Sequence, residues 1–94
     1  MRRVMHKIKK VKNSLRLYRK KNGLAQKEVA SMMGFKTTTS ISHYERGSKL
    51  PGLRNALRLE IVYHTPVAFL FRELYEDLKE EIQVRREKLG NPKD

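Results

Sequence analysis

Residues 24–47 read LAQKEVASMMGFKTTTSISHYERG, and this stretch decides the fold. Its apolar side chains recur at helical spacing in two groups: Val29, Ala30 and Met33, followed by Ile41 and Tyr44. The first group predicts a helix over 25–33 that Gly34 ends, and the second predicts a helix from about residue 38 that Gly47 ends. The sequence therefore predicts two short helices joined by a tight turn that contains glycine.

Three further helices are predicted around this pair. A helix over 14–21 follows Asn13 and Ser14, which are good N-cap residues. A helix over 52–63 is predicted by three apolar residues at four-residue spacing: Leu53, Leu57 and Ile61. A fifth helix is expected to begin at Pro66, because proline suits the first turn of a helix.

An apolar stripe of helical period continues beyond Pro66 through a segment of mixed charge: Val67, Leu70, Phe71, Leu74, Leu78, Ile82 and Leu89. The fifth helix is expected to run on, with or without a break near residue 72. No segment shows the alternation of a strand. We predict an all-α fold in which a basic arm (1–12) precedes a five-helix domain (13–71) and a charged, amphipathic C-terminal helix (72–94).

Charge is distributed unevenly along the 94 residues, whose formal net charge is +12. Residues 1–71 hold 16 lysines and arginines against three glutamates, whereas residues 72–94 are close to neutral. Such a field attracts polyanions, nucleic acid first. There is no cysteine and no stretch of the about 18 apolar residues that a membrane span needs, so we expect a soluble cytoplasmic protein.

A family resemblance rests on four pieces of the sequence: residues 23–30 (GLAQKEVA), Gly34, residues 41–47 (ISHYERG) and Pro51. Together they resemble the phage repressor/Cro-like (XRE) helix-turn-helix family over about residues 14–71. The resemblance implies a repressor-like domain that binds double-stranded DNA through the second helix of the motif. It says nothing about the DNA sequence that is bound.

Five residues fall where this family places base-facing side chains: Thr38, Thr39, Ser40, Ser42 and His43. Hydroxyls donate or accept, threonine methyls meet thymine methyls, and histidine can address guanine. None is the Arg, Asn or Gln that makes the stronger bidentate contacts, so we expect DNA shape and water to share the reading. Helix capping and solvent exposure remain the alternative roles, above all for Thr38 and Ser40.

A second set of residues is expected to hold DNA phosphates: Gln26, Lys36, Arg46, Lys49 and Arg54. Gln26 matches the family position that bonds a phosphate at the start of the first motif helix, often bracing the second helix as well. The alternative for the basic members is a solvated rim. Arg19 and Glu45 match positions that pair across helices in some relatives, and we expect a structural ion pair.

The sequence departs from the family at three places. The turn before Thr38 is one residue longer than the commonest pattern, which leaves the register there open by one position. Ala25 replaces the usual Ser or Thr and loses a cap worth about 1 kcal/mol. Glu60 stands where relatives often have alanine, and exposure, an arginine partner or a neighbouring chain are all open to it.

No feature predicts a metal, a cofactor or catalysis. The histidines, His6, His43 and His64, lie far apart and lack nearby ligands. There is no phosphate-cradling glycine loop or nucleophile motif, and Glu80 and Glu81 lie in a charged helix. We expect a protein that is not an enzyme.

The stripe of the last helix must be covered by the domain or by a second copy, and we expect a homodimer through its first part: Leu70, Leu74, Leu78 and Ile82. The leading hypothesis is a sequence-specific transcriptional regulator, a repressor that binds inverted half-sites as a homodimer. One alternative is the DNA-binding antitoxin of a toxin–antitoxin pair, in which residues 72–94 meet the toxin. Another is a basic nucleoid or RNA-binding protein without sequence preference.

Overall fold

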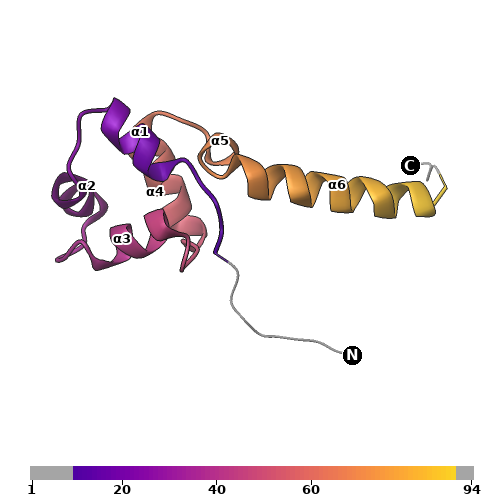
Figure 1. The fold of residues 1–94 in the computed structure, drawn as a ribbon, viewed down its shortest axis with the longest axis horizontal. Helices are drawn as coiled ribbons and strands as arrows, with labels where there is room; N and C mark the ends of the chain where they lie inside the picture. The colour runs from indigo at the N-terminus through magenta and orange to yellow at the C-terminus, as the bar shows by residue number, and fades with distance from the viewer. Residues whose placement is uncertain (1–9, 91–94) are drawn as a thin grey trace.

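The computed structural model describes residues 10–90, and every regular element in that range is a helix (Figure 1). The helices are α1 (Leu15–Lys21), α2 (Gln26–Met33), α3 (Thr39–Arg46), α4 (Leu53–Tyr63), α5 (Val67–Leu70) and α6 (Arg72–Lys88). The predicted all-α domain with a C-terminal helical extension is confirmed. The break that was left open near residue 72 is real: Phe71, with φ −123° and ψ 50°, leaves the helical conformation between α5 and α6.

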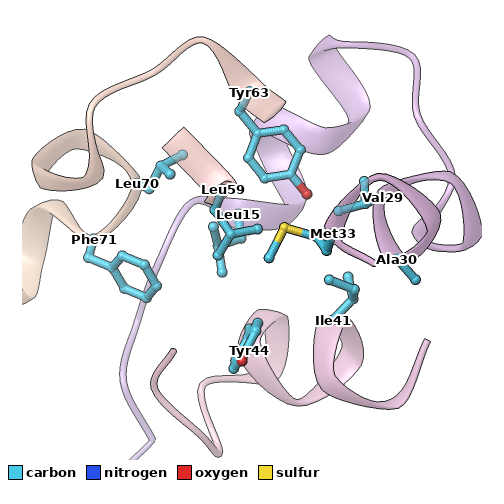
Figure 2. Packing of buried hydrophobic residues seen from close by; sticks show 10 residues of the cluster. All are labelled: Leu15, Val29, Ala30, Met33, Ile41, Tyr44, Leu59, Tyr63, Leu70 and Phe71. Atoms are coloured by element: carbon cyan, nitrogen blue, oxygen red, sulfur yellow. The ribbon is translucent and has the colours of Figure 1, made fainter. Parts of the chain in front are cut away.

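One apolar core holds α1 to α5 together, and Figure 2 shows its side chains converging. Its ten members are Leu15, Val29, Ala30, Met33, Ile41, Tyr44, Leu59, Tyr63, Leu70 and Phe71. The residues predicted to point inward from α2 and α3 are all among them. Since full burial of a Leu, Ile or Val side chain contributes about 1.5–3 kcal/mol, this cluster is the main source of the domain's stability.

Helix α4 turns a different face to the core from the stripe that predicts it. Leu59 and Tyr63 are buried, whereas Leu53, Leu57 and Ile61 are 77%, 47% and 69% exposed. Residues four apart share one side of a helix, so these three form a single apolar strip on the outside of the domain. We call Leu53, Leu57 and Ile61 the α4 strip.

Helix α5 is tied to the domain by hydrogen bonds at both of its ends. Glu60 Oε1 accepts the backbone N–H of Val67 at 3.0 Å, which caps the start of α5. The backbone N–H of Ser14 donates to the Leu70 carbonyl at 2.8 Å, which joins the end of α5 to the start of α1. The Leu70 side chain is completely buried in the core, so the prediction that it lines a dimer seam is wrong.

Helix α6 runs away from the domain (Figure 1). None of its residues is buried, and only Leu74, in its first turn, packs against the core. Five large apolar side chains on and just after this helix are about half exposed or more: Tyr75, Leu78, Ile82, Val84 and Leu89. The helix therefore displays apolar surface that its own domain leaves uncovered.

The chain just before α1 is bound to the end of α3. The backbone N–H of Val11 donates to the Gly47 carbonyl at 3.0 Å, and Asn13 Nδ2 donates to the Tyr44 carbonyl at 2.9 Å. A side chain at Gly47, whose φ is +76°, would collide with the Val11 backbone. The predicted basic arm falls mainly on residues 1–9, outside the described residues, but Val11 at its end is a packed part of the domain.

Of the two residues predicted to cap the start of α1, only Asn13 does so. Asn13 Oδ1 accepts the backbone N–H of Leu15 at 3.0 Å, while the Ser14 side chain makes no capping hydrogen bond. The Asn13 side chain therefore orders the start of α1 and, through Tyr44, fixes it to α3.

Candidate nucleic-acid interface

The turn between α2 and α3 sets the position of the second motif helix. Gly34 ends α2 in the left-handed conformation, with φ +83°, and Phe35 packs against the core. Thr37 Oγ1 then accepts the backbone N–H of Thr39 at 3.3 Å, so the threonine cluster supplies a side-chain acceptor for the start of α3. Helix α3 begins at Thr39, close to the start near residue 38 that the sequence predicts.

Helix α3 has an inner and an outer face. Ile41 and Tyr44 point into the core. The positions i, i+3, i+4 and i+7 from its first residue share the opposite side. These positions hold four polar side chains, which we call the outer face of α3: Thr39, Ser42, His43 and Arg46.

Three of the five predicted base-facing residues thus lie together with Arg46, which was predicted as a phosphate contact. Arg46 Nη1 donates to Ser42 Oγ at 2.5 Å, so the two side chains form one polar unit. The other two candidates lie to the side: Thr38 precedes the helix without a side-chain capping bond, and Ser40 is rotated by about 100° around the helix from Thr39.

Glu45 fixes α3 to both preceding helices. Its carboxylate accepts Arg19 Nε at 2.5 Å and Arg19 Nη2 at 3.1 Å, so the predicted ion pair is present in the structure. Gln26 Nε2 donates to the same carboxylate at 3.0 Å, and Arg19 Nη1 also donates to the Leu24 carbonyl. The Arg19 and Glu45 side chains are only 11% and 6% exposed. The hydrogen bonds that Arg19 donates to Glu45 raise the pKa of Arg19, so the pair stays charged.

A small cleft opens where α1, α2 and α3 meet beside this clamp. Its volume is about 260 Å³, and it is lined by Arg16, Arg19, Gln26, Ser42, Glu45 and Arg46. Since Arg19 is committed to Glu45, the cations left to meet a ligand are Arg16 and Arg46. Arg16 is not among the residues predicted from the sequence, although its position one turn before Arg19 on α1 indicates that it lies near the clamp.

The remaining predicted phosphate contacts lie at the two ends of α3. Lys36 is exposed in the preceding turn, while Lys49 and Arg54 are exposed in the following loop and the first turn of α4. An eight-residue helix is about 12 Å long, which is close to the about 12 Å width of the major groove. Exposed basic side chains thus lie on the chain segments before and after a helix of this length.

The carboxylates of the domain are all used internally. Residues 10–71 contain three: Glu28 accepts the backbone N–H of Ala25 at 2.8 Å, Glu45 is clamped, and Glu60 caps α5. The bond from the Ala25 N–H to Glu28 satisfies the N-cap residue's own backbone donor, while the side-chain cap that Ala25 lacks is not replaced. The three carboxylates keep their negative charges, but the lysines and arginines of residues 10–71 far outnumber them, so the net field of this segment is positive.

A helix-turn-helix of this geometry, with a polar outer face on its second helix and basic side chains around it, defines a DNA-binding module. The profile of the helix-turn-helix family HTH_3 matches residues 15–70, from the first residue of α1 to the last of α5. The chain belongs to this XRE/Cro-type family, which implies sequence-specific DNA binding and is generally not catalytic. A comparison with curated proteins gave no match.

Two further findings concern the part of the chain that the structure describes. No helix in residues 10–90 is long and apolar enough to cross a membrane. Within the same range, no three residues of the histidine, aspartate and glutamate types gather as they would around a metal ion.

Proposed function

We propose that this protein is a transcriptional repressor that binds inverted half-sites as a homodimer. The observation that carries the proposal is the outer face of α3, on which Thr39, Ser42, His43 and Arg46 point away from the core on a helix clamped by Glu45. Repression follows when a bound dimer blocks access to a promoter. Two-fold symmetric proteins and palindromic operators match each other, which favours a dimer.

The outer face of α3 is suited to reading bases through several small contacts. Thr39 and Ser42 each offer a hydroxyl, and His43 offers a ring nitrogen to a purine. Arg46 is the strongest donor of the four, and its bond to Ser42 couples their orientations. We therefore expect Arg46 to contact a base edge or a neighbouring phosphate, according to where α3 stops in the groove.

Phosphate contacts are proposed on both sides of α3. In the cleft, Arg16 and Gln26 face one strand, and the amide group of Gln26 is already fixed by Glu45. Lys36, Lys49 and Arg54 frame the ends of α3. These contacts carry affinity and position the helix, but they carry no sequence information.

Selection of bound DNA from a random library tests the proposal. The wild type should yield a motif of two inverted half-sites, about one helical turn apart between centres. Thr39→Ala and Ser42→Ala should relax the motif at particular positions, each mismatch being worth about 1–3 kcal/mol. The matched control Ser31→Ala changes an exposed serine of α2 and should leave the motif unchanged.

The same experiment separates repressors from basic proteins without sequence preference. A protein driven by phosphates alone would return no motif and would lose binding evenly to competitor DNA. A motif without inverted symmetry would contradict the homodimer. A reporter whose promoter contains the selected motif should fall in expression when the protein is present, and a rise would contradict repression.

A second candidate, the DNA-binding antitoxin, is favoured by one observation, the exposed α4 strip. Three adjacent apolar side chains outside the helix-turn-helix suit the attachment of a second protein. In that case the product of the neighbouring gene should arrest growth when expressed alone, and co-expression of this protein should relieve the arrest. Leu57→Asp should abolish the relief without changing the selected DNA motif.

A further inference from the structure

The exposed apolar residues of α6 follow a heptad. From Tyr75 the seam positions are spaced by three, four, three and four residues: Tyr75, Leu78, Ile82, Arg85 and Leu89. The four residues predicted to form the dimer seam, Leu70, Leu74, Leu78 and Ile82, have a constant step of four, which drifts around a helix, whereas the 4-3 alternation stays on one side. Tyr75, Leu78, Ile82 and Leu89 are 49%, 48%, 50% and 73% exposed.

We propose that α6 is one strand of a parallel, two-stranded coiled coil with a second copy of this chain. The inference rests on the proposed dimeric regulator and specifies its dimer interface. In heptad notation Tyr75, Ile82 and Leu89 occupy a positions, and Leu78 and Arg85 occupy d positions. A β-branched residue at a with leucine at d, as at Ile82 and Leu78, favours two strands.

A preformed hole is present where this seam leaves the domain. In a coiled coil each knob enters a hole made by four residues of the facing helix at i, i+3, i+4 and i+7. The hole for the partner's Tyr75 consists of Phe71, Leu74, Tyr75 and Leu78. Leu74, Tyr75 and Leu78 of α6, together with the buried Phe71 just before this helix, line an apolar groove of about 410 Å³, whose other wall includes Leu50, Pro51 and Ala56. A second α6 on the seam would therefore also cover this groove.

The charges beside the seam select the parallel orientation. In a parallel pair, a residue at g faces the e residue five positions further on in the partner. Glu81 then meets the partner's Arg86, and the symmetry repeats this attraction. In the antiparallel register that sets Ile82 against the partner's Leu78 along the whole of α6, Glu81 would meet the partner's Glu81, and Lys79 would meet the partner's Lys79. Like charges at both flanks would oppose that arrangement.

Arg85 is the one charged residue within the seam. Its guanidinium lies 3.6 Å from the Glu81 carboxylate one turn earlier, which draws it towards the edge of the seam. A charged residue at a core position lowers the stability of a coiled coil while restricting its register. Arg85→Leu should therefore tighten self-association by about tenfold or more, whereas Ile82→Asp should weaken it by a similar factor.

Cysteine cross-linking in the full chain without DNA tests the interface, because the protein has no cysteine of its own. In a parallel pair Leu78 faces the partner's Leu78 at the separation that a disulfide needs, so Leu78→Cys should oxidise to a covalent dimer. Val84→Cys is the matched control, since Val84 is similarly exposed but lies on the other side of α6. Equal cross-linking of both variants, or of neither, would overturn the proposal.

A charge exchange tests the orientation. Glu81→Lys and Arg86→Glu should each weaken the dimer about fivefold, as measured by sedimentation. The double variant should recover the wild-type affinity, because the attraction is restored with its signs exchanged. No recovery would overturn the parallel arrangement. DNA selection with the wild type distinguishes the two failures: a motif with inverted symmetry and no cross-link through Leu78 places the dimer interface elsewhere, and no motif rejects the proposed function.

Discussion

At the scale of single residues, Glu45 does most to define the interface. One carboxylate on α3 receives two hydrogen bonds from Arg19 on α1 and one from Gln26 on α2. Three helices thus share one anchor, which lies directly behind the outer face of α3. Because the ionised partners are nearly buried, removing one leaves a charge that water cannot fully solvate.

Glu45→Ala should therefore lower the free energy of unfolding by about 2–4 kcal/mol, since it leaves the Arg19 guanidinium without its partner. Chemical denaturation at neutral pH measures the change. Arg16→Ala, one turn away on an exposed face of α1, is the control and should change stability by less than about 0.5 kcal/mol. Equal effects of the two substitutions would show that the clamp does not stabilise the domain.

A second test at single-residue scale is the free energy of unfolding at alkaline pH, which depends on Tyr63. Burial is the main cause that raises the pKa of Tyr63 to about 12, nearby Glu45 adds to the rise, and Arg19 opposes it. The folded state therefore holds this proton more tightly than the unfolded state, whose tyrosines ionise near pH 10. The contribution is complete below pH 10 and is lost between pH 10 and 12, by up to about 2–3 kcal/mol.

Tyr63→Phe should remove this part of the loss between pH 7 and pH 11. At pH 7 it should leave stability unchanged or higher, because the buried hydroxyl has no hydrogen-bond partner among the described residues. Denaturation at the two pH values measures both effects. Tyr75→Phe, at an exposed position, should keep the wild-type alkaline loss. An equal loss in all three proteins would contradict the assignment to Tyr63.

Among the helices, α4 shows that the spacing of apolar residues does not decide which side of a helix is buried. The sequence carries two overlapping apolar patterns on this helix, the α4 strip and the pair Leu59 and Tyr63 with Ala56. Periodicity predicts that a helix forms but cannot choose between two apolar sides. The choice is made by packing: Asn55, on the inner side, donates to the Tyr44 hydroxyl at 3.2 Å.

Ile61→Lys should therefore change the free energy of unfolding by less than about 0.5 kcal/mol, because it alters an exposed position near the end of α4 where a cation suits the helix dipole. Leu59→Ala, two residues away, should cost about 2–5 kcal/mol, because it empties part of the core. Thermal or chemical unfolding of both variants makes the comparison. A large loss for Ile61→Lys would mean that the α4 strip is covered within the domain.

Other elements were predictable to different degrees. Helices α1 to α4 follow from local spacing, caps and glycines. The Arg19 and Glu45 pair came from the family resemblance, since residues 26 apart cannot be joined by local pattern. The role of Glu60 could not be predicted, because its partner is a backbone N–H beyond a turn. Likewise, only the structure shows that Leu70 faces inward while the apolar residues after Leu74 do not.

At the scale of the whole molecule, charge and apolar surface are separated. Cations surround the helix-turn-helix, where the three carboxylates are engaged in hydrogen bonds. The largest groups of exposed apolar side chains lie on α6 and on the α4 strip, and none lies on the outer face of α3. This division suits a protein whose basic helix-turn-helix binds a polyanion and whose apolar surface binds a second protein chain.

Lys49→Ala and Arg54→Ala should weaken binding to all DNA sequences alike and should reduce the slope of log affinity against log salt by about 1 each. The slope should fall because each substitution removes one phosphate contact and the release of counterion that goes with it. Titrations of one operator across a range of salt concentrations measure the slope. Lys88→Ala, at the far end of α6, should leave the slope unchanged. An unaltered slope for Lys49→Ala and Arg54→Ala would reject their phosphate contacts.

The clamp at Glu45 also has a kinetic consequence. A recognition helix that is already fixed on α1 and α2 needs no ordering step when it meets DNA, so charge steering alone should set the rate of encounter. Operator and random DNA should then capture the protein at similar rates. Discrimination between them should appear in how long each complex lasts.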